Sequence, residues 1–280
     1  MYLVTGATGN VGSEVVNQLL AQGERVRVFT RNAAKVAHWG DRVEVAVGDF
    51  GKPETFAQAI KGVKGVFIVN GGPDLETFKR VIATAQADGK PRIVFLSSVL
   101  AATPELKIGK IHKDKEDTIR EAGLDGKFVR AGGFMSNSYQ WIGSIKADGA
   151  VYNALGDRRF PPIAPEDIAA VAVKALTENL RGEIFEVTGG ELVSVAEETN
   201  ILSKILGKPL RCLDVPTEAA VQGMIRNGIP AGVAAAVGES FQAFREGRSG
   251  SEMKDTVERL TGKRPMTFEG WAKKHAHRFA

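Results

Sequence analysis

Short apolar runs alternate with amphipathic segments along the first half of the chain. Several of these runs are apolar throughout, which is typical of strands buried on both faces of a sheet. The predicted strands cover residues 2–4, 25–30, 43–47, 65–69, 92–96 and 127–130, and the predicted helices cover residues 10–22, 53–60, 74–88 and 109–122. Strands that alternate with helices predict an α/β fold with a parallel, doubly wound sheet and right-handed crossovers.

The second half of the chain is less regular and mostly helical. Its predicted strands are residues 183–188 and 210–215, and its predicted helices are residues 165–177, 194–206, 217–227, 231–246 and 251–260, with a last helix that starts near residue 267. No linker, repeat or low-complexity segment divides the chain. Apolar residues between 234 and 244 recur at helical spacing. Such a face suits a substrate lid or a contact within a homodimer.

Three glycines lie between the first predicted strand and the first predicted helix, in the spacing G-x-x-G-x-x-G. Gly6 permits a tight turn, Gly9 lets backbone N–H groups approach a pyrophosphate, and Gly12 lets the helix pack close to the strand. The helix N-terminus adds N–H donors and the positive end of its dipole. An ordinary strand-to-helix turn is the alternative. We predict a Rossmann-like dinucleotide site whose cofactor-binding residues here are Gly6, Thr8, Gly9, Asn10, Val11 and Gly12.

The residue that follows the second predicted strand bears on the choice of cofactor. An acidic residue there would bind the adenosine ribose hydroxyls, whereas a basic residue favours a 2′-phosphate. The chain has Arg31 at this position, with Lys35 one helical turn later. A solvated surface arginine is the alternative. We predict NADP(H) as the cofactor, with residues 1–150 forming its Rossmann core. Residues 151–280 would be mainly a substrate-binding lobe, with some strands returning to the core.

Further candidate residues lie at the ends of the other predicted strands. Asp49 and Phe50 follow the third strand and could bind the adenine, although Asp49 fits a turn or an N-cap equally well. Asn70 and Gly71 follow the fourth strand, and Ser97 ends the fifth. Because ligands of doubly wound sheets bind beyond the carboxyl ends of the strands, we expect these residues to converge on the cofactor.

Composition excludes several other classes of function. The net charge of +4 comes without a run of basic residues, so we expect no nucleic-acid partner. The single cysteine, Cys212, excludes an internal disulfide and a multi-cysteine metal site, and we expect no metal. No apolar run reaches the roughly 20 residues that a membrane span needs. The first predicted strand begins at residue 2, so we expect a cytoplasmic protein without a signal peptide.

Several stretches match one known group of proteins. They are Val4 to Gly12, Thr30 to Asn32, Gly48 to Phe50, Phe95 to Ser98, the segment from His112 to Leu124, and Val129 to Asn137. Together they make the chain resemble the NmrA-like group of atypical short-chain dehydrogenases, over essentially its whole length. This group includes NADPH-dependent quinone reductases, triphenylmethane-dye and azo-dye reductases, isoflavone-type ether reductases and redox-sensing transcriptional regulators.

The helix that carries the catalytic pair in common short-chain dehydrogenases differs here. Those enzymes use a tyrosine and a lysine one turn apart, but residues 109–122 contain no tyrosine. His112 is our candidate catalytic residue, with Glu116 one turn later as a carboxylate that could hold its tautomer. A surface histidine on a polar helix is the alternative. Relatives that use a lysine tend to carry it at the position of Asp117, so lysine catalysis is not expected here.

The end of the sixth predicted strand should lie over the nicotinamide. The resemblance implies that Gly132 and Phe134 border the reacting face. The expected substrate-pocket residues are Phe134, Met135, Asn137, Tyr139 and Trp141. Core packing is the alternative for each aromatic residue.

These observations favour an NADPH-dependent reductase of an electron-poor conjugated acceptor, such as a quinone, an azo dye or a triphenylmethane dye. Hydride transfer to such an acceptor can depend mainly on positioning, with little acid–base help. The alternative is a non-catalytic NADP(H) sensor that regulates a partner protein. An epimerase or lyase using bound NAD is a third hypothesis, disfavoured because those enzymes generally need the tyrosine.

Overall fold

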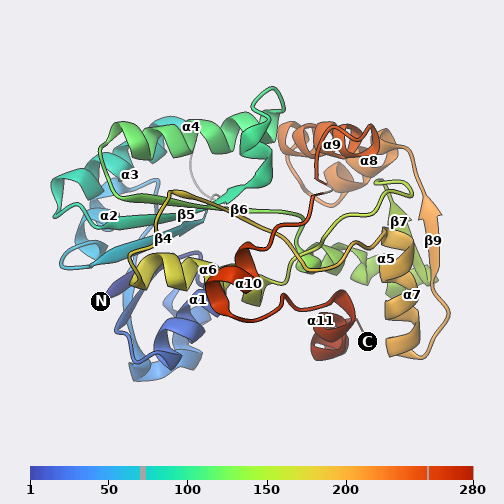
Figure 1. Cartoon of the computed structure of the whole chain (residues 1–280), viewed down its shortest axis with the longest axis horizontal. Coiled ribbons are helices and arrows are strands. Elements are labelled where there is room, and N and C mark those ends of the chain that lie inside the picture. Colours follow the sequence, from blue (N-terminus) through green and yellow to red (C-terminus); the bar gives the residue numbers. More distant parts are fainter. Residues whose placement is uncertain (70–73, 251, 280) are drawn as a thin grey trace.

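A seven-stranded parallel sheet forms the centre of the molecule (Figure 1). The computed structural model describes residues 1–69, 74–250 and 252–279. The sheet has the order β3-β2-β1-β4-β5-β6-β8, and every neighbouring pair is parallel. Its strands are β1 (Tyr2–Thr5), β2 (Val26–Thr30), β3 (Val43–Val47), β4 (Gly65–Val69), β5 (Arg92–Ser98), β6 (Gly126–Ala131) and β8 (Ile184–Val187). The predicted doubly wound, Rossmann-like sheet is confirmed.

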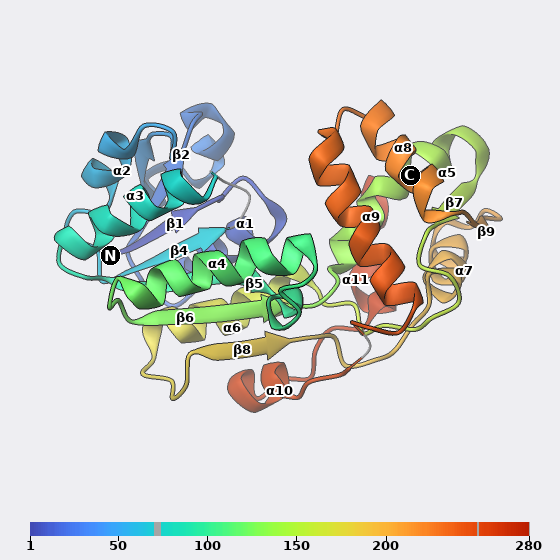
Figure 2. The same cartoon turned by 90° about the horizontal axis from the view of Figure 1, so that it is seen from above.

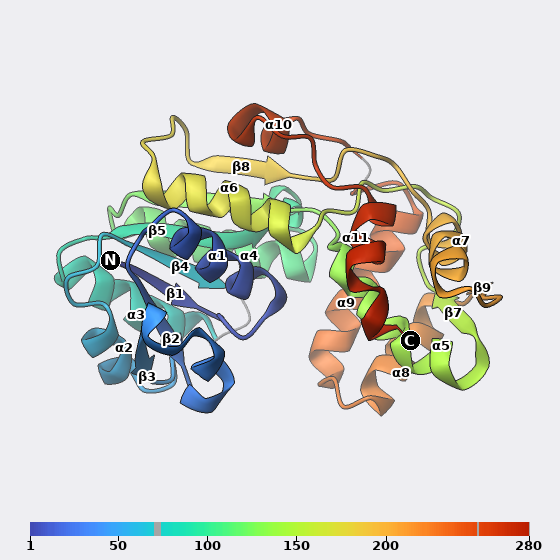
Figure 3. The same ribbon diagram turned by 90° about the horizontal axis from the view of Figure 1, so that it is seen from below.

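Helices cover both faces of this sheet, as Figures 1 and 3 show. One face carries α1 (Asn10–Ala21), α6 (Pro165–Thr177) and α10 (Thr256–Thr261), and the other carries α2 (Pro53–Ala59), α3 (Leu75–Ala87) and α4 (Lys107–Glu121). Each face has its own apolar core, one built around Val15 and Leu19 of α1, the other around Phe78 and Ile82 of α3. Burial of both sheet faces explains why β4 and residues 93–96 of β5 are apolar.

A smaller lobe lies beyond the carboxyl ends of the sheet strands (Figure 2). It contains the helices α5 (Ile142–Asp148), α7 (Val195–Leu206), α8 (Thr217–Arg226), α9 (Ala231–Arg245) and α11 (Phe268–His275), and a two-stranded parallel sheet of β7 (Ala150–Asn153) and β9 (Arg211–Asp214). Its separate core centres on Phe268, Trp271 and Phe279, all without exposed surface. The predicted smaller, mostly helical lobe is also confirmed.

Two details of the second half go beyond the predicted pattern or differ from it. The strand predicted at residues 210–215 is present as β9, and it pairs with β7, a strand that the pattern did not predict. The helix predicted at residues 251–260 begins at Thr256. Residues 252–255 before it are neither helix nor strand; there Lys254 donates its backbone N–H to Thr188 Oγ1 and its ammonium pairs with Glu186.

Short 3₁₀ helices fill connections that had no strong pattern. They are η1 (Ala33–Arg42), η2 (Val99–Ala102), η3 (Met135–Trp141) and η4 (Ala276–Arg278). Two of them come after the carboxyl ends of sheet strands: η2 follows β5 directly, and η3 begins a few residues after β6. Within the described residues, no helix is both long and apolar enough to cross a membrane.

Candidate cofactor and active site

A cavity of about 490 Å³ lies at the carboxyl ends of β1, β2 and β3. Most of the predicted cofactor residues of this region contribute to its walls, namely Gly6, Thr8, Arg31, Lys35, Asp49 and Phe50. Gly9, Asn10, Val11 and Gly12 are not wall residues but form the start of α1 beside it. Asn70 and Gly71 lie outside the described residues. The structure therefore brings together residues from three separate strand ends.

The glycine turn has the geometry that the spacing predicts. Gly6 has a φ of 62°, in the left-handed region that favours glycine, and a Cβ there would lie 2.5 Å from Val69 Cγ2. A Cβ on Gly12 would lie 2.2 Å from the carbonyl oxygen of Gly6, so a larger residue cannot fit without moving the turn. The glycines thus let α1 begin close against the end of β1.

The N-terminus of α1 is suited to a phosphate group. Its N-cap is Gly9, no side chain caps the helix, and no acidic residue stands in its first turn. The first N–H groups of a helix have no partner within the helix, so an anion can accept their hydrogen bonds. Pyrophosphate is the group that the turn would hold.

Two cations flank the same cavity. Arg31 and Lys35 are exposed wall residues, and within the described part of the chain neither is recorded in an ion pair. Asn32 orients the segment between them, because its side chain caps η1 by accepting the N–H of Ala34 at 2.9 Å. Both positive charges are therefore available to a 2′-phosphate.

Shortly after β3, Asp49 stabilises a turn. Its Oδ1 accepts the N–H of Gly51 at 2.8 Å, which agrees with the turn role left open by the sequence. Phe50 packs against Phe29 and Phe56 with ring centroids 5.3 and 5.5 Å apart. Its ring is therefore held as part of the cavity wall beside Asp49.

A second cavity, of about 340 Å³, adjoins the first through the shared wall residue Val69. Its other walls are Leu96, Ser97, Ser98, His112, Ala131, Gly132, Phe134 and Asn137. These residues come from the ends of β5 and β6, from α4, and from the segment after β6 that leads into η3. Apolar walls with a few polar groups are typical of a small-molecule site. Ser97, His112, Gly132, Phe134 and Asn137 were all predicted from the sequence.

His112 is neutral near pH 7 in this structure. Burial, and secondarily the charge of Lys115, lower its pKa from 6.5 to about 4. A neutral imidazole has one N–H donor and one acceptor nitrogen. His112 could therefore donate a hydrogen bond to a ligand in the cavity, but it would not stabilise a negative charge as an imidazolium.

Lys115 is a buried cation next to this histidine that the sequence reasoning did not single out. It is 4% exposed and its ammonium lies 5.2 Å from the centre of the Phe78 ring. Burial lowers the pKa of Lys115 to about 8. Lys115 lies in a helix rich in charged residues, where the sequence gives no sign that one lysine is buried. Its burial is seen only from its packing against α3.

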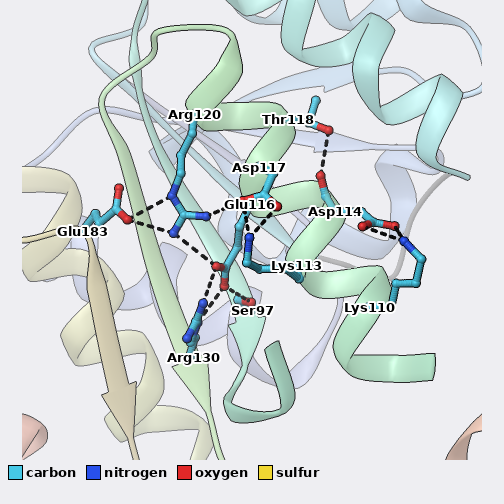
Figure 4. Close-up of polar contacts among 10 residues, drawn as sticks. All are labelled: Ser97, Lys110, Lys113, Asp114, Glu116, Asp117, Thr118, Arg120, Arg130 and Glu183. Atoms are coloured by element: carbon cyan, nitrogen blue, oxygen red, sulfur yellow. Dashed lines mark hydrogen bonds and ion pairs between the residues drawn. The ribbon is translucent and has the colours of Figure 1, made fainter. Parts of the chain in front are cut away.

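Glu116 does not hold the tautomer of His112, because no hydrogen bond joins the two side chains in the described structure. Its carboxylate instead accepts Ser97 Oγ at 2.6 Å, Arg130 Nε at 2.9 Å and Arg130 Nη2 at 2.6 Å (Figure 4). Arg120 Nη2 lies 3.4 Å from Oε2. Arg130 on the sixth predicted strand and Glu116 on the predicted helix before it carry opposite charges at otherwise apolar positions. This was the only sign of their pairing that the sequence offered.

Three predicted substrate residues do not contribute to either cavity. Met135 and Trp141 are buried in the core of the smaller lobe. Tyr139 packs against Trp271 and Phe279, and the guanidinium of Arg278 lies 3.8 Å from the centre of its ring. This packing matches the core alternative that the sequence left open for the two aromatic residues. Among the described residues, no cluster of three or more side chains could hold a metal ion.

Comparison with known proteins identifies the family. Residues 6–179 match the family model described as NAD(P)H-binding. A (4-alkanoyl-5-oxo-2,5-dihydrofuran-3-yl)methyl phosphate reductase of Streptomyces griseus is 36% identical, over 100% of this chain and 99% of that protein. An NAD(P)H azoreductase of Xenophilus azovorans is 34% identical, again over 100% of this chain and 99% of the relative.

Solved structures share the fold over nearly the whole chain. The triphenylmethane reductase of Citrobacter sp., complexed with NADP(H), has a TM-score of 0.83 at 23% identity and covers 99% of this chain and 100% of its own. The NADPH-dependent quinone oxidoreductase of Escherichia coli, complexed with NADPH, has a TM-score of 0.84 at 22% identity with the same coverage.

The fold and the site therefore define a nicotinamide-nucleotide-dependent oxidoreductase. The chain belongs to the NAD(P)H-binding family, and relatives that match it over its whole length are reductases. Its own residues fit such a cofactor, because the glycine turn and the start of α1 can hold the pyrophosphate.

Proposed function

We propose that this protein is an NADPH-dependent reductase that delivers hydride to an electron-poor, conjugated acceptor of the quinone, azo-dye or triphenylmethane-dye type. The observation that carries the proposal is the second cavity, which adjoins the cofactor cavity and has largely apolar walls. Its polar wall residues are Ser97, Ser98, His112 and Asn137, none of them charged at pH 7. A flat, conjugated molecule fits this chemistry.

The bound nucleotide would supply the hydride, and the chain's residues would bind and orient the reactants. The start of α1 and the glycine turn would hold the pyrophosphate, while Gly132 and Phe134 would border the reacting face. Hydride transfer to an electron-poor acceptor depends chiefly on positioning, so a site without a tyrosine–lysine pair suffices. The two relatives named above act, by their names, on conjugated systems, an unsaturated lactone and an azo compound.

The positions of the two cavities support different roles for the two halves of the chain. Residues 1–150 would form the NADP-binding core, and residues 151–280 would be mainly the substrate lobe, with α6 and β8 returning to the core. The two cavities have all their walls between Thr5 and Asn137, at the edge of the sheet that faces the smaller lobe. The lobe would then cover the substrate rather than supply the reacting face.

Preference for the phosphorylated cofactor would come from Arg31 and Lys35. Arg31→Ala should weaken NADPH binding about tenfold, as expected for loss of a charge-assisted hydrogen bond, and should leave NADH binding nearly unchanged. Calorimetric titration of both nucleotides into the wild type and the variant measures this. Equal losses for the two nucleotides would contradict the assignment.

The reaction itself is tested by following NADPH oxidation at 340 nm with a panel of acceptors. The panel contains a naphthoquinone, an azo dye, a triphenylmethane dye and an unsaturated lactone. Turnover with at least one of them supports the proposal. Tight NADPH binding without any turnover would refute it and favour the non-catalytic sensor.

A further inference from the structure

A buried polar cluster lies directly behind the wall of the second cavity. Ser97 at the end of β5, Glu116 on α4 and Arg130 on β6 are 3%, 0% and 6% exposed. Figure 4 shows their side chains converging between the helix and the sheet. Ser97 is the member that also forms part of the cavity wall. Whether its hydroxyl group donates or accepts a hydrogen bond therefore affects the binding of any ligand in the cavity.

The direction of each hydrogen bond in the cluster follows from chemistry. A guanidinium group can only donate, so Glu116 must accept from Arg130 through both carboxylate oxygens. Ser97 Oγ lies 2.6 Å from Glu116 Oε1, an acceptor, so Ser97 must donate its one proton to that oxygen. What remains of the hydroxyl group are its two lone pairs. Among the described residues, no N–H or O–H group is recorded as donating to them.

The neighbouring serine has the opposite arrangement. Ser98 Oγ accepts the backbone N–H of Leu100 at 3.2 Å, which leaves the proton of Ser98 free to donate elsewhere. The two adjacent serines in the cavity wall are thus oriented differently, one by a carboxylate and one by a backbone N–H group. This contrast provides a matched control within the same cavity.

We propose that Ser97 acts as a hydrogen-bond acceptor for the substrate, with Glu116 and Arg130 as positioning residues that hold it in that role. The inference rests on the proposed function and narrows its substrate class. The site would select conjugated acceptors that carry an N–H or O–H group beside the reducible system. Ser97 would not polarise a substrate carbonyl, in contrast to a serine whose proton is free.

The expected selectivity follows from the burial of the cluster. A ligand that donates to Ser97 satisfies a buried oxygen, whereas a methylated ligand leaves that oxygen without a partner. Sites built to hydrogen-bond a ligand hydroxyl discriminate strongly against analogues that lack the donor. One neutral hydrogen bond of this kind corresponds to a preference of about fivefold to tenfold.

The test uses two redox-inert aromatic probes, 2-naphthol and 2-methoxynaphthalene. Each is titrated into the NADP⁺ complex and the dissociation constants are measured by NMR. The wild type should prefer 2-naphthol, and Ser97→Ala should remove this preference. Ser97→Thr, which keeps a hydroxyl group, should restore it. Ser98→Ala should change binding of both probes equally, because both probe oxygens can accept the Ser98 proton.

A further variant tests the positioning role. In Glu116→Gln the amide N–H₂ can donate to Ser97 Oγ and release the serine proton toward the cavity, so the preference for 2-naphthol should fall. Circular dichroism checks that this variant is folded. If Glu116→Gln is unfolded, the comparison of Ser97→Ala with Ser97→Thr still tests whether Ser97 accepts a hydrogen bond from the ligand.

A wild type that binds the two probes equally, or a Ser97→Ala variant that keeps the preference, would overturn the inference. These outcomes are independent of turnover. A protein that shows the probe preference but oxidises no NADPH with any acceptor would retain the inferred acceptor role of Ser97 and lose the proposed function. Turnover without the preference would do the reverse.

Discussion

The ion pair between Glu116 and Arg130 provides the sharpest test of the structure. Glu116 has no exposed surface, and the guanidinium of Arg130 binds both of its oxygens. We consider three variants: Arg130→Met, Glu116→Leu and the double variant. Each single substitution leaves one charge buried without its main partner, whereas the double substitution removes both charges and replaces them with apolar side chains of similar size.

The expected magnitudes follow from this burial. Removing one partner of a buried ion pair costs about 3–5 kcal/mol of unfolding free energy, while replacing both with apolar residues is often nearly neutral. The loss of unfolding free energy for Arg130→Met should lie toward the lower end of this range, because Arg120 Nη2 remains 3.4 Å from Glu116 Oε2. The double variant leaves Ser97 without its acceptor, which costs about 1 kcal/mol. It should therefore be more stable than either single variant.

Urea unfolding followed by circular dichroism measures these differences. The comparison requires similar dependence of the free energy on urea in all four proteins, so that midpoints report stability. The double-mutant cycle then gives the coupling between the two side chains. Additive losses in the double variant, or single losses below about 1 kcal/mol, would refute the inferred burial and pairing.

Three further predictions follow from single residues. Gly12→Ala should abolish nucleotide binding in calorimetry and destabilise the fold by about 1–3 kcal/mol, because its Cβ would lie 2.2 Å from the Gly6 carbonyl oxygen; unchanged binding would contradict this packing. Relative to His112→Gln, the wild type should lose stability as the pH falls from 6.5 to about 4, since the unfolded histidine binds a proton in that range and the folded one does not. The loss is at most about 3 kcal/mol, and parallel pH profiles of the two proteins would rule it out. Relative to Lys115→Met, the wild type should gain stability between pH 8 and pH 10.5, because the unfolded lysine retains the proton there; denaturation midpoints measured across that range decide it.

Much of the cofactor half follows from local pattern. The strands β1 to β6 and the helices α1 to α4 lie within a few residues of their predicted ranges, because buried strands and amphipathic helices have different periods. The glycine turn is equally local, since Gly6 and Gly12 act within one strand-to-helix connection. Where a range was wrong, as for the start of α10, the residues before the helix contact a distant part of the chain: Lys254 bonds Thr188, just beyond β8.

The residues of the substrate region were harder to place. Asn137 and Phe134 line the second cavity, but Trp141, four residues beyond Asn137, is part of the lobe's core. The segment η3 carries polar and aromatic side chains without a clear period, so its sequence does not show which of them face the cavity. Tyr139 is likewise positioned by α11, more than 100 residues later in the chain.

By itself, the sequence determined the strands and helices of the cofactor half and the glycine turn, because each depends on neighbours within about a dozen residues. Its motifs along the chain also indicated the family. Only the tertiary structure decided that Glu116 pairs with Arg130 and Ser97 rather than with His112, and that β9 pairs with β7. The physical reason is that a side chain's partners and its burial depend on which segments pack together, and segments distant in the chain carry no local mark of their contact.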